Sequence, residues 1–224
     1  LKIKIKKEII TFSRMKLDVE KNTAIHVNSK NWNSLIEDKD TLVLDVRNNF
    51  ENELGTFKNS FGPKTKNFSE FKKFIDKDLL QQNHKQIAMF CTGGIRCEKA
   101  SSYMLKKGFK NLYQLKGGIL NYLEKIPKDQ SRWKGECFVF DNRVSVKNEL
   151  AIGTYKLCYG CRMPINNTEL KSDKYEKGVS CIRCFDSLSN DKKEKLRERN
   201  KQIEVAKRKG IYSPYIQHKT SNFL

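Results

Sequence analysis

The amino-acid sequence predicts an α/β fold, in which a parallel sheet flanked by helices is followed by a small four-cysteine module and a basic C-terminal helix. Between residues 24 and 130, short apolar runs alternate with segments of helical character, an order typical of parallel β-α units. After residue 130, a strand-like segment at 136–146 precedes two C-x-x-C pairs and a charged stretch. We therefore expect an α/β domain at 24–130 and a C-terminal part at 131–224. Residues 1–23 would be a remnant strand or linker of an upstream domain.

The individual elements follow from the hydrophobic pattern. Alternating apolar and basic residues at 1–6 predict a half-buried strand. Continuous apolar runs predict strands buried on both faces of a sheet, at residues 41–46, 86–90 and 111–115. Apolar periodicity and helix start and stop residues predict the helices, at residues 32–36, 50–54, 68–80, 97–107 and 119–126. The phenylalanines of the helix at 68–80 share one face, which favours core packing over base stacking.

Positive charge dominates the composition. The chain has 45 Lys and Arg against 26 Asp and Glu, a net charge of +19, which favours polyanions such as nucleic acid or anionic membrane surfaces. Abundant lysine and asparagine with sparse arginine are also what an AT-rich genome produces. The predicted helix at 190–209 carries nine basic and four acidic residues, so it is interpreted either as an RNA-binding element or as a solvated helix.

Several classes of protein are excluded by the sequence. No apolar run approaches the ~20 residues of a membrane span, and no secretory signal is visible, so we expect a cytoplasmic protein without a membrane partner. Seven cysteines, four of them in two C-x-x-C pairs, suit metal-binding and catalytic thiols in a reducing compartment better than a disulfide framework. The first residue is Leu1 rather than Met, which predicts that the true N-terminus is missing.

Cys91 is the candidate nucleophile. It directly follows an apolar run and precedes two glycines, an arginine and a predicted helix. Loop amides and a helix N-terminus direct positive partial charge toward such a sulfur, which lowers the pKa of the thiol. The alternative is a small buried core residue. The glycines and Arg96 have no evident packing purpose, so the reactive interpretation is favoured.

The loop from Cys91 to Arg96 has six members. Its other residues are expected to cradle an anion carried on the sulfur, with Arg96 binding the loop or the anion through its guanidinium; they are Thr92, Gly93, Gly94 and Ile95. Cysteine phosphatases use a loop that is one residue longer, so the narrower loop favours a persulfide or a small oxygen adduct over phosphate chemistry.

Two further residues are candidates for supporting roles. Asp45 ends a predicted strand, and ligands bind at the carboxyl ends of parallel strands; it could equally cap the chain or pair with an arginine. Cys97 lies six residues after Cys91 and is interpreted either as a thiol that resolves an oxidised or persulfidated Cys91 or as a packing residue.

The two C-x-x-C pairs predict a metal site. Each pair can present two thiolates in a tight turn, and two pairs complete a tetrahedral four-sulfur site as in a zinc ribbon; the ligands would be Cys158, Cys161, Cys181 and Cys184. With no open coordination position, such a Zn²⁺ would be structural. Redox-active dithiols are the alternative. Cys137 is left over and is expected to be buried in a strand.

These motifs resemble the rhodanese family, in which Cys91 to Arg96 corresponds to the active loop. The family's other signatures have counterparts in Asp45-Val46-Arg47 with Glu51 and Gly55, and in Gly117-Gly118-Ile119; Thr56 replaces the usual histidine. The longer stretch at 91–100, together with segments at 109–118 and 138–144 and the cysteine pairs, is similar to the bacterial tRNA uridine hydroxylases that contain a rhodanese domain.

That resemblance implies hydroxylation of C5 of uridine 34, the wobble base of certain tRNAs, with O2 and a reductant as co-substrates. It also implies a rhodanese-like fold, Cys91 as the catalytic cysteine with a persulfide intermediate, and the tRNA anticodon loop as partner. Family members usually carry an N-terminal ferredoxin-like domain, most of which this chain lacks. No flavin, haem or iron motif is visible.

Two other functions use the same residues. A thiosulfate or persulfide sulfurtransferase would employ the Cys91 loop, although such an enzyme needs no four-cysteine appendage. A non-catalytic RNA-binding module would rest on the four-cysteine module and the basic helix, but the intact Cys91 argues against it.

Overall fold

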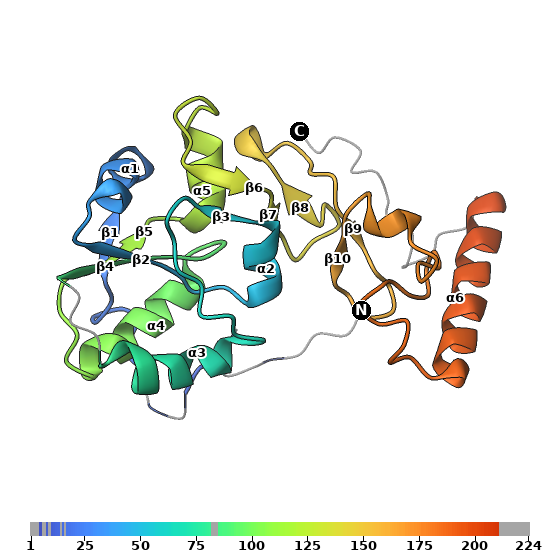
Figure 1. Ribbon diagram of the computed structural model, residues 1–224, viewed down its shortest axis with the longest axis horizontal. Coiled ribbons are helices and arrows are strands. Elements are labelled where there is room, and N and C mark those ends of the chain that lie inside the picture. The colour runs from blue at the N-terminus through green and yellow to red at the C-terminus, as the bar shows by residue number, and fades with distance from the viewer. Residues whose placement is uncertain are drawn as a thin grey trace. The chain divides into compact units, whose positions relative to one another are not determined.

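The fold is built on a four-stranded parallel sheet, shown in the computed structural model of Figure 1, which describes residues 5, 8, 10–13, 15, 17–81 and 85–210. The strand order is β1-β5-β4-β2, and the strands are β1 (Ile25–Val27), β2 (Thr41–Asp45), β4 (Gln86–Phe90) and β5 (Leu112–Leu115). The three predicted strands are confirmed. The edge strand β1 was not predicted. Its three residues form a strand by pairing with β5, where Ile25 lies opposite Tyr113, nearly ninety residues away in the sequence.

Helices cover both faces of this sheet (Figure 1). They are α1 (Ser29–Glu37), α3 (Phe68–Phe74), α4 (Ile95–Lys106) and α5 (Gly118–Lys125). A further short helix, α2 (Asn49–Leu54), follows β2 in the chain. One core combines α3 and α4 with sheet residues such as Leu44 and Met89. The other combines α1 and α5 with the alternate residues, among them Val43 and Ala88. Adjacent strand residues thus enter opposite cores, as expected for a sheet buried on both faces.

Three helices differ from their predicted extent by more than one residue. The helix predicted at 32–36 is longer and spans Ser29–Glu37. The helix after the Cys91 loop begins at Ile95 rather than at residue 97, because the left-handed Gly94 (φ 98°) ends the loop and its carbonyl accepts the first helical hydrogen bond. The helix predicted over 68–80 changes at Ile75 into one π-helical turn, Ile75–Leu79. Its predicted core face is confirmed, since Phe68, Phe71 and Ile75 are buried.

Short strands outside the parallel sheet form two further pairs. β3 (Gly55–Phe57) pairs antiparallel with β6 (Trp133–Gly135), and β7 (Cys137–Phe138) pairs with β8 (Ser145–Val146). The strand-like segment predicted at 136–146 therefore forms only two short strands. One compact unit comprises Leu1–Val139 with Val146–Ile152, and the other comprises Phe140–Ser145 with Gly153–Leu224. The predicted boundary at residue 130 stays a prediction.

The second unit contains β9 (Lys156–Leu157), β10 (Pro164–Ile165) and the helix α6 (Asn190–Arg208), which Ser189 caps through the N–H of Lys192 at 3.3 Å. β9 and β10 form an antiparallel pair. Leu196 is the buried residue of α6, so the helix predicted at 190–209 is present and packs only lightly. Within the described part of the chain, no helix combines the length and the hydrophobicity needed to cross a membrane. The strand predicted at 1–6 lies largely outside the described residues.

Candidate active site and metal centre

Cys91 follows β4 at the carboxyl edge of the parallel sheet and begins the loop that leads into α4. The start of α5 supports this loop. A Cβ added at Gly118 would lie 2.6 Å from the carbonyl oxygens of Cys91 and Thr92, so glycine is required there. The N–H groups of Ile119 and Leu120 donate to the same two oxygens at 3.0 and 3.2 Å. Backbone contacts with a second helix thus hold the loop in place.

The surroundings of the Cys91 sulfur favour the thiolate. The N–H of Gly94 donates to Sγ at 3.2 Å. The pKa of Cys91 is lowered to about 6, chiefly by a hydrogen bond from the Cys97 thiol; the charge of Arg96 and the backbone N–H groups of Cys97 and Gly94 act in the same direction, against burial. At neutral pH Cys91 is therefore in its nucleophilic form.

The remaining loop residues have different roles. The Thr92 hydroxyl accepts a hydrogen bond from Arg96 at 3.1 Å, so it braces the arginine. Gly93 and Ile95 are exposed, and a Cβ placed at Gly93 or Gly94 would meet nothing within 4 Å among the described residues. The loop is therefore open to an incoming molecule beside the two glycines.

Arg96 is held by a carboxylate that sequence reasoning did not place in the site. Its Nη1 and Nη2 donate to Oε2 and Oε1 of Glu51 at 2.6 and 2.7 Å, and the two side chains are 8% and 0% exposed. Glu51 also closes the N-terminal cap of α2 through the N–H of Asn48 at 3.2 Å. The pair therefore ties α2 to the active loop. The only sequence signal for Glu51 was its position in the rhodanese-like signature.

Asp45 has the pairing role that was one of its two interpretations. It is fully buried, and its carboxylate accepts hydrogen bonds from Nε and Nη2 of Arg47 at 2.9 and 2.6 Å. Asn52 and Thr56 donate to the same carboxylate at 3.2 and 3.0 Å. These contacts join the end of β2 to α2 and β3 and leave Asp45 committed to the scaffold.

Cys97 lies in the first turn of α4 and is 1% exposed. Burial raises the pKa of its thiol, and the adjacent Cys91 adds to the effect. The two cysteines thus differ: Cys91 ionises readily and Cys97 keeps its proton. Cys137 is also buried, which raises its pKa to about 12, and the prediction that it is buried in a strand is confirmed.

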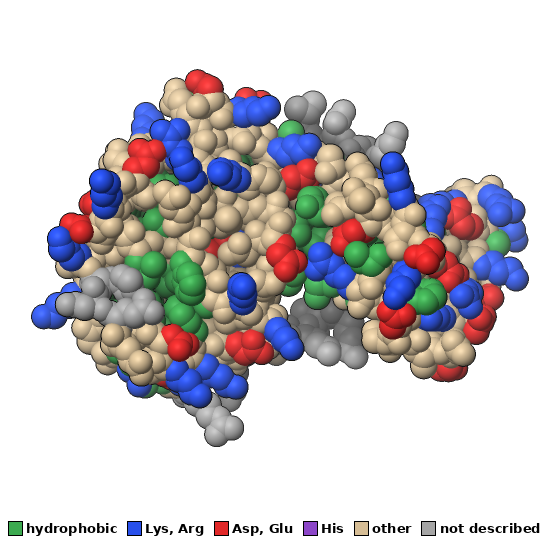
Figure 2. Space-filling view, viewed as in Figure 1, with side chains coloured by type: hydrophobic (Ala, Val, Ile, Leu, Met, Phe, Trp, Pro, Cys, Tyr) green, Lys and Arg blue, Asp and Glu red, His purple; other side chains and the backbone are tan. Residues whose placement is uncertain are grey.

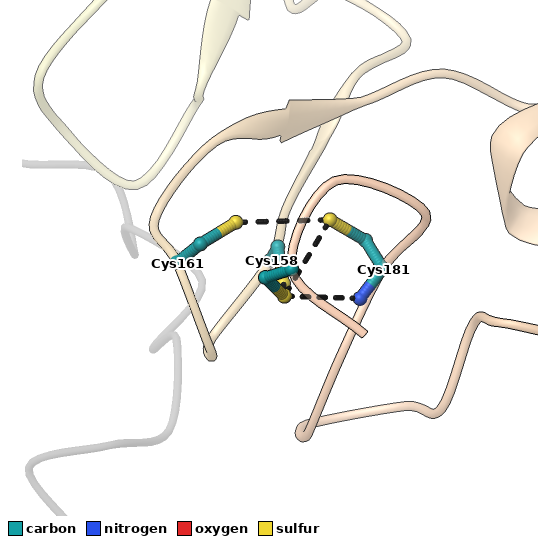
Figure 3. Close-up of side chains that lie close together, drawn as sticks. Cys158, Cys161 and Cys181 are labelled. Atoms are coloured by element: carbon teal, nitrogen blue, oxygen red, sulfur yellow. Dashed lines mark hydrogen bonds between the residues drawn. The ribbon is translucent and has the colours of Figure 1, made fainter. Parts of the chain in front are cut away.

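The second unit brings the four predicted metal ligands together; Cys158, Cys161 and Cys181 are labelled in Figure 3. The sulfurs lie within 4.8 Å of one another, with 3.8 Å from Cys158 to Cys184, 3.7 Å from Cys161 to Cys181 and 3.9 Å from Cys181 to Cys184. Four sulfurs placed tetrahedrally at about 2.3 Å from a zinc ion would be about 3.8 Å apart, whereas bonded sulfurs are about 2.05 Å apart. The four cysteines can therefore hold a metal ion.

The chain was then compared with known proteins. It is 56% identical over 209 residues to the protein named tRNA uridine(34) hydroxylase of Pelagibacter ubique (strain HTCC1062), a match that covers 93% of this chain and 68% of that protein. This chain belongs to the tRNA uridine(34) hydroxylase family. Residues 29–125 match the rhodanese-like domain family, so this hydroxylase-family member has a rhodanese domain around Cys91.

Solved structures similar to this family member include rhodanese-type domains. A rhodanese-related protein from Thermoplasma volcanium is 24% identical, with a TM-score of 0.36 over 46% of this chain and 95% of that one. A rhodanese-like domain protein from Staphylococcus aureus is 22% identical, with a TM-score of 0.36 over 44% and 90% of the two chains.

Many basic residues around the cysteine cluster of this hydroxylase-family chain have acidic neighbours. Lys174 pairs with Asp186 at 2.6 Å, and Arg183 lies 3.6 Å from Glu169. Nε of Arg197 in α6 lies 2.7 Å from a carboxylate oxygen of Glu176, a residue whose backbone forms an isolated β-bridge with Ser180. Lysine and arginine side chains are scattered over the visible face of the molecule among acidic ones (Figure 2). The net charge of α6 therefore overstates its capacity to bind phosphates.

The lowered pKa of Cys91 predicts the pH dependence of its alkylation in this hydroxylase-family protein. Above the pKa the thiolate reacts and below it the thiol does not, so the rate with iodoacetamide should be half-maximal near pH 6 instead of near 8.5, the usual value for cysteine. Peptide mass spectrometry of samples alkylated at each pH measures the rate at which Cys91 is modified. Cys137 is the internal control and should stay unmodified across this range. A Cys91 midpoint near pH 8.5 would contradict the electrostatic description of the loop.

Proposed function

We propose that this chain hydroxylates C5 of uridine 34 in tRNA, with Cys91 as the catalytic cysteine. The observation that carries this proposal is the 56% identity to a tRNA uridine(34) hydroxylase across 93% of the chain, combined with a Cys91 loop that stabilises a thiolate. The reaction converts a C–H bond to C–OH, which consumes O2 and two further electrons and releases water. O2 and a reductant are therefore co-substrates. A tRNA substrate makes the cytoplasm the expected location.

Contact with the tRNA backbone is supported by a basic hollow of about 560 Å³ beside the active loop. It is lined by Asn28, Ser29, Lys30, Lys116, Gly117, Asn121 and Lys125. Its lining has three lysines and no carboxylate, and lysines bind phosphates without reading sequence. Gly117 precedes the Gly118 that touches the Cys91 loop. An anticodon stem whose phosphates lie against these lysines would bring its loop close to Cys91.

The metal that suits the four cysteines best is Zn²⁺. Cys158, Cys161, Cys181 and Cys184 would hold it as thiolates in a closed tetrahedral site, which suits structural zinc. Bound there, zinc would neutralise and fix the thiolates. It would have no free position for substrate, so its contribution would be to the folding of this unit.

The decisive experiment uses cells that lack the hydroxylase activity. We expect that expression of the unaltered chain restores 5-hydroxyuridine-derived nucleosides, measured by mass spectrometry of digested tRNA, and that Cys91→Ala does not. Cys137→Ser is the matched control, because it also removes a buried thiol from the same unit and should behave like the unaltered chain. Equal nucleoside profiles for the unaltered chain and Cys91→Ala, with thiosulfate:cyanide sulfurtransfer lost only in the variant, would favour the sulfurtransferase instead.

A further inference from the structure

Cys97 is a buried thiol beside the nucleophile with no other assigned task. It is 1% exposed, belongs to the same core cluster as Cys91, and lies in the first turn of α4, the helix into which the Cys91 loop leads; its thiol also contributes to lowering the pKa of Cys91. The other cysteines are elsewhere. Cys137 belongs to the core cluster on the opposite face of the sheet, and the four metal-site thiols belong to the second unit. Cys97 is thus the thiol placed to react with Cys91.

The two thiols are in complementary states. Cys91 receives hydrogen bonds from the Cys97 thiol and from backbone N–H groups, and the charge of Arg96 lies nearby. Cys97 receives no comparable stabilisation and keeps its proton. A thiolate next to a thiol can be oxidised to a disulfide, which releases two electrons. A reaction that inserts one oxygen atom from O2 requires two such electrons.

We propose that Cys91 and Cys97 together are the immediate electron donor of the hydroxylation and close to a disulfide in each turnover. This inference rests on the proposed function. The uridine C5–H, O2, the Cys91 thiolate, the Cys97 thiol and one proton become C5–OH, water and the Cys91–Cys97 disulfide. Two electrons of the four that O2 takes up come from the C–H bond and two from the sulfur pair. One oxygen atom enters the base and the other leaves as water.

The position of Cys97 allows the disulfide to form. A disulfide requires the two sulfurs to approach to about 2.05 Å. Cys97 lies in the first turn of α4, where its backbone N–H has no partner within the helix and acts instead on the Cys91 sulfur, so the two residues already face each other across the start of the helix. Arg96 need not move, because it is anchored by Glu51. A thiol reductant would then regenerate the pair by exchange, and the open side of the loop at Gly93 is its route of approach.

A single-turnover experiment tests this inference directly. The full chain is reduced, freed of reductant, and mixed with substrate tRNA lacking the modification in aerated buffer. After acid quenching and alkylation, it is digested with trypsin, which cuts between Arg96 and Cys97. A Cys91–Cys97 disulfide therefore appears as the peptide 86–96 linked to the peptide 97–99. We expect this linked pair to form mole for mole with 5-hydroxyuridine, and not when tRNA or O2 is omitted.

Variants separate the electron-donor role from packing. Cys97→Ser should give no linked peptide and only background 5-hydroxyuridine under these conditions, while Cys137→Ser should match the unaltered chain. Unchanged tryptophan fluorescence shows that Cys97→Ser is folded, and an added chemical reductant should restore part of its turnover. If 5-hydroxyuridine forms while both peptides are recovered separately alkylated, the inference is wrong and the hydroxylase function stands. If no reductant allows the unaltered chain to make 5-hydroxyuridine, the proposed function itself fails.

Discussion

Removing the metal from the cysteine cluster is expected to unfold the second unit while the rhodanese domain stays folded. The core cluster around the ligands has four buried members, of which three are the cysteines Cys158, Cys181 and Cys184 and the fourth is Ile165. So small an apolar core cannot offset the conformational entropy of ordering some sixty residues. Binding of a structural zinc ion contributes about 10–16 kcal/mol in comparable small modules. A metal ion bound by the four cysteines, rather than burial of apolar surface, would therefore account for the stability of this unit.

The distribution of tryptophan lets one sample report on both units. Trp32 and Trp133 both lie in the first unit, so tryptophan fluorescence follows that unit alone. Limited trypsin digestion follows the second unit through its many lysines and arginines. A strong chelator, or Cys181→Ser, should make residues 153–210 sensitive to trypsin and leave the fluorescence unchanged. Cys137→Ser should retain one metal ion per chain. A metal-free protein whose second unit still resists trypsin would refute this account.

The parts of the fold that could be predicted are those that a local sequence pattern determines. Strands β2, β4 and β5 consist of continuous apolar runs, and such runs identify strands that are buried on both faces. The pairing of β3 with β6 was not predicted, because Gly55 and its partner Gly135 are far apart in the sequence. A strand of three residues is too short to show a hydrophobic pattern from which it could be predicted. Its stability comes from the partner strand, which no short window of sequence contains.

Local motifs and long-range contacts also differ in how well they could be predicted at the metal site and at the Cys91 site. The four candidate metal ligands could be selected from the sequence because their chemistry depends on spacing within each C-x-x-C pair, and the sulfurs do converge. Cys91 could be selected as the candidate nucleophile because its glycines are adjacent in sequence. Glu51 was not, because its task depends on Arg96, which is 45 residues away. Asp45 was ambiguous until its contact with Arg47 was visible. Long-range charge pairing is the information that sequence patterns lacked here.

The ion pair between Arg96 and Glu51 predicts that Arg96→Ala lowers the free energy of unfolding and raises the pKa of Cys91. Glu51 would become a fully buried carboxylate without its counter-charge, and breaking one side of a buried pair typically costs about 3–5 kcal/mol of unfolding free energy. Arg96 also lowers the pKa of Cys91, so its loss should shift the alkylation midpoint of Cys91 to higher pH. Urea unfolding followed by tryptophan fluorescence measures the first effect, and peptide alkylation at a series of pH values measures the second.

A double variant separates these two consequences. Replacing both members with neutral side chains, as in Glu51→Gln with Arg96→Met, removes the uncompensated charge, so most of the lost stability should return. The alkylation midpoint of Cys91 should nevertheless remain high, because the cation near the sulfur is still absent. Lys85→Ala disrupts the exposed pair with Asp40 and should change neither quantity, since exposed ion pairs contribute little. A double variant in which stability and the midpoint recover together would mean that Arg96 acts only by holding the loop in shape. Recovery of stability alone would assign to Arg96 a direct electrostatic effect on the Cys91 thiolate.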